Sequence, residues 1–257
     1  MSKMSNTTLF TPEWPQSIVD IDAAARAKNM PESEIERLWA THGLLAKLFS
    51  GQYRGSGRPF ISHLAGTAGL ALAHDGDHDE ILASYAHAAY AQGDFGRLIQ
   101  GASPANRRAL RAVIGETAED LVFKYDDFDW VRLLKQHSRD EKLSVSDDGR
   151  KLMFVKVLNE LDDSMDCGVY DTSWCEQCLH RLDLGASLVH ELGRYSVAKH
   201  IRTHTKVLRA SGLVETPGIR RKQSVTIVNP DFAEKPLLKL GRKVRDLASR
   251  IKNRLHF

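Results

Sequence analysis

Apolar residues repeat at helical spacing along most of this 257-residue sequence, and this pattern limits the fold more than any other feature. In the range 31–50, Pro31 and Glu32 suit a first turn, and the apolar residues that follow lie about 3.6 residues apart. Further helices are expected at 60–74, 78–92, 104–114, 116–125, 127–137, 149–165, 173–192 and 195–210. Only 224–228 alternates like a strand. The sequence therefore predicts an all-α fold, a helical bundle with short connections.

Composition narrows the class of protein. With 42% hydrophobic residues and a net charge of +3, the chain has too much apolar content for disorder to be its main state. No run approaches the roughly 18 apolar residues that a membrane span needs, and no secretory signal is visible at the N-terminus. Three cysteines do not make a disulfide framework. We therefore expect a cytoplasmic protein.

The chain divides into four segments by pattern. We expect a flexible N-terminus at 1–14, the helical domain at 15–210, a linker at 211–235 and a basic amphipathic helix at 236–257. Seven Lys or Arg against one Asp give that last segment a local charge of +6. The helix could pack on the domain, pair with another copy, or contact an anionic membrane or an acidic protein, which would make the protein peripheral to a membrane. Nucleic acid is not an expected partner, because aromatic residues do not alternate with the basic ones.

The residues that carry chemistry lie on three expected helices. His63 begins the helix at 60–74, whose small residues allow another helix to approach closely, and His87 lies on the next helix. On 149–165 and just beyond it, the spacing places Asn159, Asp162, Asp163 and Asp166 on one face. Imidazoles and carboxylates that converge between helices can build a metal site or an acid/base site.

Three short stretches resemble the HD-domain superfamily, most closely the helical hydrolase domain of RelA/SpoT-like proteins. They are Gly57-Arg-Pro-Phe-Ile-Ser-His63, Ala83-Ser-Tyr-Ala-His87-Ala88 and Val155-Lys-Val-Leu-Asn159-Glu, in matching order over about 34–165. The resemblance implies an HD-like helical bundle in which His63 and His87 are metal ligands. Ala88 and Asn159 stand where the family has aspartates, so its standard ligand set is not expected.

Two interpretations of the site stay open. In the first, His63 and His87 hold one divalent metal ion (Fe, Mn or Zn) together with Asp163 or Asp162, and Asn159 completes the ligand set. The protein would then be a hydrolase or oxygenase with a non-standard ligand set. In the second, the pocket is metal-free, and it binds a ligand or uses His63 and His87 for acid/base work.

We expect the catalytic residues to be His63, His87 and Asp163. Arg54 and Arg58 would neutralise a small anionic or phosphorylated metabolite, with Tyr90 and Asp94 as further substrate contacts. The alternative function is a catalytically inactive HD-like module that binds a ligand or a protein.

Plainer interpretations compete with each of these roles. His63 and His87 could be ordinary helix histidines, and Arg54 and Arg58 could be solvated loop residues. For the acidic run Asp162 to Asp166, we expect a solvated face rather than metal ligands. The three cysteines are expected to be buried thiols and not a zinc site.

Overall fold

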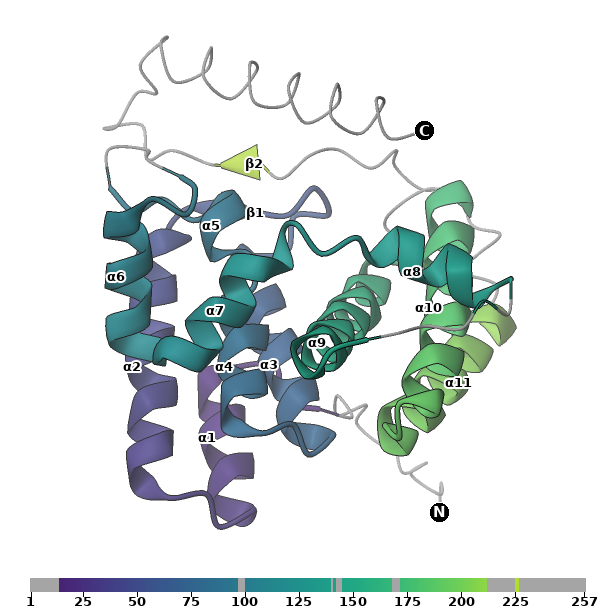
Figure 1. Cartoon of the computed structure of the whole chain (residues 1–257), viewed down its shortest axis with the longest axis horizontal. Coiled ribbons are helices and arrows are strands. Elements are labelled where there is room, and N and C mark those ends of the chain that lie inside the picture. Colours follow the sequence, from purple (N-terminus) through teal and green to yellow (C-terminus); the bar gives the residue numbers. More distant parts are fainter. Residues whose placement is uncertain are drawn as a thin grey trace, which may run out of the picture.

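The computed structural model describes residues 14–96, 100–139, 141, 145–167, 172–211 and 225–226 (Figure 1). It is helical almost throughout this part of the chain, which confirms the all-α prediction. The helices are α1 (Ile18–Ala27), α2 (Glu32–Leu48), α3 (Phe60–Ala73), α4 (His78–Ala86), α5 (Ala89–Gln92), α6 (Pro104–Ile114), α7 (Glu116–Tyr125), α8 (Trp130–His137), α9 (Asp147–Asp163), α10 (Thr172–Glu191) and α11 (Tyr195–Ala210). A 3₁₀ turn, η1 (Ser164–Asp166), follows α9. None of the described helices is long and apolar enough to cross a membrane.

Helix α9 is the element around which the others are arranged. It packs against α3, α4 and α7 on one side and against α10 on the other (Figure 1). Its side chains Phe154, Leu158 and Leu161 are completely buried. This central position lets the C-terminal end of α9 meet residues from α3 and α4.

Local sequence explains several of the helix ends. Asp77 and Glu80 form a capping box at the start of α4, and Ser103 and Ser146 cap α6 and α9 with their side-chain oxygens. Helix α1 was not expected from the sequence, although Ser17 caps it by accepting a hydrogen bond from the Asp20 backbone. A Ser followed three residues later by an acid is the signal that could have identified this helix.

The expected helix at 78–92 is interrupted beside a site residue. Helix α4 ends at Ala86, and α5 begins only at Ala89. His87 lies in this break, where its Nδ1 is 2.8 Å from the backbone carbonyl of Ser84. The break therefore helps to set the direction of the His87 ring.

Two short strands join distant parts of the sequence. β1 (Gln52–Tyr53) pairs antiparallel with β2 (Val225–Thr226), with Gln52 opposite Thr226 and Tyr53 opposite Val225. β2 lies within the strand expected at 224–228, whereas β1 lies in a segment that was expected to be a loop. The expected helix at 236–257, its possible partners and most of the expected linker and N-terminus lie outside the described residues, so they stay predictions.

Small residues on α3 allow the close approaches that its sequence suggested. A Cβ added at Gly69 would lie 2.0 Å from the carbonyl oxygen of Pro15, and one added at Gly66 would lie 2.0 Å from the Asp162 carboxylate. The three cysteines are buried, as expected for thiols in a core.

We predict that Gly69→Ala destabilises the protein, because the methyl group would force the backbone at Pro15 off α3. The expected loss is about 1–3 kcal/mol of unfolding free energy in urea. The control is Gly43→Ala in α2, where no atom lies within 4 Å of the added Cβ. This variant should gain roughly 0.5–1 kcal/mol, as alanine does over glycine inside a helix. Equal effects at both positions would contradict the packing of Pro15 on α3.

Candidate functional site

His63 and His87 face each other across the interface between α3 and the end of α4. Their Nε2 atoms lie 3.3 Å apart, and the two ring planes are nearly perpendicular, at 87°. The side chains are buried, with exposed fractions of 1% and 4%. The structure thus brings together the two histidines that were singled out in the sequence.

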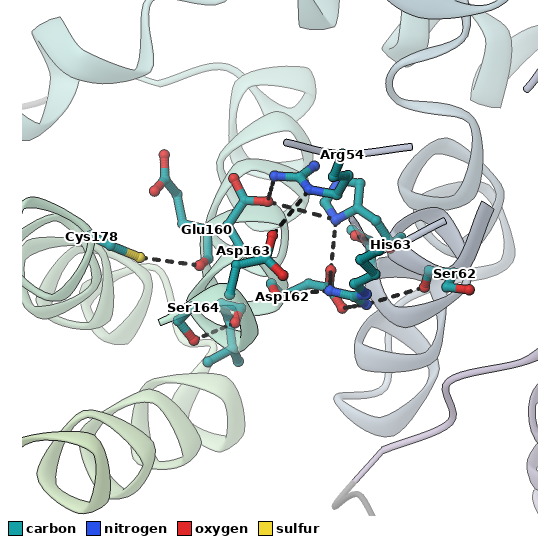
Figure 2. A network of polar contacts seen from close by, with 12 residues as sticks. Arg54, Ser62, His63, Glu160, Asp162, Asp163, Ser164 and Cys178 are labelled. Atoms are coloured by element: carbon teal, nitrogen blue, oxygen red, sulfur yellow. Dashed lines mark hydrogen bonds and ion pairs between the residues drawn. The ribbon is translucent and has the colours of Figure 1, made fainter. Parts of the chain in front are cut away.

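The carboxylate of Asp162 contacts the opposite edge of the His63 ring. Its Oδ2 lies 2.6 Å from His63 Nδ1 (Figure 2). Arg58 donates to both carboxylate oxygens of Asp162, each at 2.8 Å. The absence of a side chain at Gly66 leaves the space that this carboxylate occupies.

Arg54 neutralises the remaining acidic groups of the cluster. Its guanidinium pairs with Asp163, and its Nε lies 3.3 Å from Asp166 Oδ2. Arg54, Asp163 and Asp166 are all buried. Two guanidiniums thus face three carboxylates in the interior of the protein.

The expectation of a solvated acidic face is therefore wrong. Asp162, Asp163 and Asp166 are all buried, with exposed fractions of 0%, 6% and 3%. Buried charges are tolerated when they are paired and hydrogen-bonded, and the arginines come from a loop more than 100 residues earlier. The same pairing shows that Arg54 and Arg58 are not simply solvated loop residues.

The hydrogen bonds determine where protons lie in this cluster. His87 Nδ1 must donate to the Ser84 carbonyl, which can only accept, so His87 Nε2 carries a lone pair when the ring is neutral. His63 Nε2 must then carry the proton between the two rings. One further proton is shared between His63 Nδ1 and Asp162, because two lone pairs at 2.6 Å would repel.

Burial determines the direction of each pKa shift. It raises the pKa of Asp162 above the usual aspartate value, and the Arg58 charge opposes this shift. It lowers the pKa of His63 well below its usual value, with the Arg54 charge adding to the effect and the Asp163 charge and the Asn159 side chain opposing it. Burial also lowers the pKa of His87 to about 3, and His63 adds to this shift. His87 is therefore neutral at pH 7, and burial disfavours a charge on both partners of the short contact between His63 Nδ1 and Asp162.

The donor set does not fit the expected metal site. His63 and His87 offer two nitrogens, whereas protein metal sites ordinarily use three or four protein ligands. Asp163 is paired with Arg54 and lies 3.7 Å from His63 Nδ1, the nitrogen that faces away from His87. In the described ranges, no group of three or more His, Cys, Asp or Glu is placed to hold a metal ion.

The structure gives Tyr90 and Asp94 partners away from the histidine pair. The Tyr90 hydroxyl donates to Glu119 at 2.6 Å, and Glu119 also pairs with Arg107 and Arg111. Asp94 accepts a hydrogen bond from the Gly96 backbone at 2.9 Å. Neither expected substrate contact is joined to His63 or His87 by a described interaction.

Two residues near the histidines were missed by sequence reasoning. The Tyr125 ring lies 5.1 Å from the His87 ring, and the Lys156 ammonium lies 3.5 Å from the centre of the Tyr125 ring. Lys156 precedes Asn159 by three residues on α9, which is a spacing that could have identified it.

Comparison with known families gives one match. The family described as "Domain of unknown function (DUF6817)" matches residues 44–129, about a third of the chain. This range includes His63, His87 and Tyr125 but ends before α9, so it lacks the acidic residues of the site. No curated protein matches the sequence. The resemblance to the HD-domain superfamily thus stays a prediction.

We predict that Arg58→Met strongly destabilises the protein, because it would leave Asp162 buried without its ion pair. The expected loss of unfolding free energy is about 3–5 kcal/mol in urea. Adding Asp162→Asn to this variant should recover part of the loss. The control is Arg26→Met, which removes exposed ion pairs with Asp22 and Glu32 and should cost less than about 1 kcal/mol. A mild effect at Arg58 would mean that the arginine is free for a ligand.

The pH dependence of the free energy of unfolding should report the protonation of the His87 imidazole. Between about pH 6.5 and pH 3, the unfolded chain protonates this imidazole while the folded protein keeps it neutral, so stability falls as the pH falls. His87→Gln should reduce this slope by up to about 1.4 kcal/mol per pH unit. Urea unfolding of both proteins at pH 7, 5.5 and 4.5 measures the difference. Parallel profiles would show that His87 is not neutral and buried.

Proposed function

We propose that this chain is a divergent HD-like protein that binds a small anionic or phosphorylated metabolite and transfers a proton through His63. The observation that supports this proposal is the continuous hydrogen-bonded chain from Asp162 through His63 and His87 to the Ser84 carbonyl. A buried imidazole with a carboxylate on one nitrogen and a proton on the other is suited to general acid/base catalysis.

The proton balance of such a step follows from the hydrogen bonds. A substrate that takes the place of His87 next to His63 Nε2 would receive the Nε2 proton. His63 Nδ1 would then take the shared proton from Asp162. The resulting Asp162 carboxylate would be stabilised by the two hydrogen bonds from Arg58. The reverse sequence makes His63 a general base, and Asp163 acts by holding Arg54 and not by contacting the substrate.

In a second form of this proposal, the same site holds a divalent metal ion (Fe, Mn or Zn). His63 and His87 would supply two nitrogens, and such an ion would supply Lewis-acid chemistry for a hydrolase or oxygenase. The described donors fall short of an ordinary ligand set, so no step is assigned to the ion.

The second candidate function is a catalytically inactive module for ligand or protein binding. It is favoured by the ion pairs that already satisfy Arg54, Arg58 and the three carboxylates. The near-complete burial of both imidazoles favours it as well.

The first test is the position of the protons on the two imidazoles, measured by nitrogen-15 NMR at pH 7. We expect His87 to carry its proton on Nδ1 and His63 to carry one on Nε2. A His63 ring with no proton on Nε2 would contradict the proton-transfer proposal. Elemental analysis of the same untagged sample, beside the His63→Ala/His87→Ala double variant, tests the metal form. Stoichiometric metal that disappears in the double variant would support that form, and no metal after reconstitution would contradict it.

The second test is turnover of phosphate monoesters and phosphorylated metabolites, with and without added Fe, Mn or Zn. If the protein is an enzyme, His63→Gln should abolish turnover, and Asp162→Asn should lower it about 10²–10⁴-fold. Asp183→Asn, which removes an exposed carboxylate on α10, is the control and should leave turnover unchanged. No turnover of any compound by the unmodified protein would favour the inactive module.

A further inference from the structure

Lys156 brings a positive charge to the edge of the histidine pair. Its ammonium lies 3.5 Å from the centre of the Tyr125 ring, and that ring in turn contacts the His87 ring. On α9, Lys156 lies three residues before Asn159 and seven before Asp163, so the three residues share one face of the helix. Asn159 and Asp163 both act on His63, and Lys156 extends this face toward His87.

Lys156 differs from Arg54 and Arg58 because none of the described carboxylates is paired with it. Within the part of the chain that the structure describes, its ammonium makes no ion pair or hydrogen bond, and the Tyr125 ring is its contact. Asp126 and Glu160 act on it through their charge alone, and Glu160 is paired with Arg181 at 2.9 Å.

This environment is unfavourable for a lysine in the absence of a ligand. The side chain is half-buried, and burial lowers the pKa of Lys156 from its usual value to about 8. Its charge also contributes to the low pKa of His87. A cation over an aromatic ring gains some energy from the ring, but less than it would gain from a bound anion.

We propose that Lys156 binds the anionic group, a phosphate or a carboxylate, of a small ligand beside His87. Lys156 thereby takes the role that the sequence had suggested for Arg54 and Arg58, whose charges are used inside the protein. The Tyr125 ring holds the ammonium in place. The anion then lies next to the imidazoles that carry the exchangeable proton. This inference rests on the proposed function only where it links the bound anion to proton transfer. Anion binding itself can be measured separately.

The experiment is a titration with inorganic phosphate, and separately with acetate, at constant ionic strength and pH 7. Binding is followed by the NMR signals of the His63 and His87 imidazoles. We expect saturable shifts of these signals with at least one anion, and the anion that saturates at lower concentration identifies the ligand class. Lys156→Met should weaken binding at least tenfold, whereas Lys156→Arg, which keeps the charge, should retain most of it.

The matched control is Lys151→Met, which removes the same charge from the same helix. Lys151 is paired with Asp77 at 2.6 Å, so Lys151→Met should leave anion binding unchanged. Lys156→Gln serves as a second neutral variant, and amide proton spectra verify that each variant is folded. Shifts that do not saturate in the unmodified protein, or equal affinity in Lys156→Met, would overturn the inference.

The same spectra separate this inference from the proposed function. Saturable binding that depends on Lys156, together with a His63 ring that lacks a proton on Nε2, would contradict proton transfer and leave the anion site in place. If the protons on His87 Nδ1 and His63 Nε2 are observed but no anion binds saturably, the anion site is contradicted and the proton-transfer proposal is not.

Discussion

The site depends on the burial of the Asp162 carboxylate between α9 and α3. An isolated carboxylate in a protein interior is strongly unfavourable, so every neighbour of Asp162 must compensate for its loss of water. Arg58 does so with two hydrogen bonds, and His63 does so through the short contact at Nδ1. Gly66 provides the space, because any larger residue would collide with the carboxylate. The orientation of His63, and through it the contact with His87, follows from this arrangement.

The balance of charge explains why the site is suited to hold a proton. Three buried carboxylates face the guanidiniums of Arg54 and Arg58, and one shared proton makes the cluster neutral. This proton lies in the 2.6 Å contact between Asp162 and His63, where burial disfavours the charged form of each partner. A proton held in this way can be passed along the chain at little cost in charge separation.

Prediction from the sequence succeeded where the pattern was local and periodic. Most helix positions, the close-packed face of α3 and the proximity of His63 and His87 follow from spacing and residue size. The acidic run was misjudged because composition cannot show whether a carboxylate faces solvent or an arginine more than 100 residues away. Lys156 was missed for a related reason, because the sequence cannot show that no carboxylate is paired with it in the described part of the chain. Tyr90 was assigned to the substrate by its nearness to His87 in sequence, but Glu119 on another helix takes its hydroxyl.

The sequence by itself determined that the chain is all-α, and it singled out two histidines on neighbouring helices. Helical periodicity and small residues are properties of the sequence near each position, and they need no knowledge of the rest of the chain. The tertiary structure alone decided which charges are paired, which imidazole nitrogen faces which neighbour, and which cation lacks a carboxylate partner among the described residues. These depend on burial and on contacts between segments far apart in sequence, because hydrogen bonding and desolvation act through space.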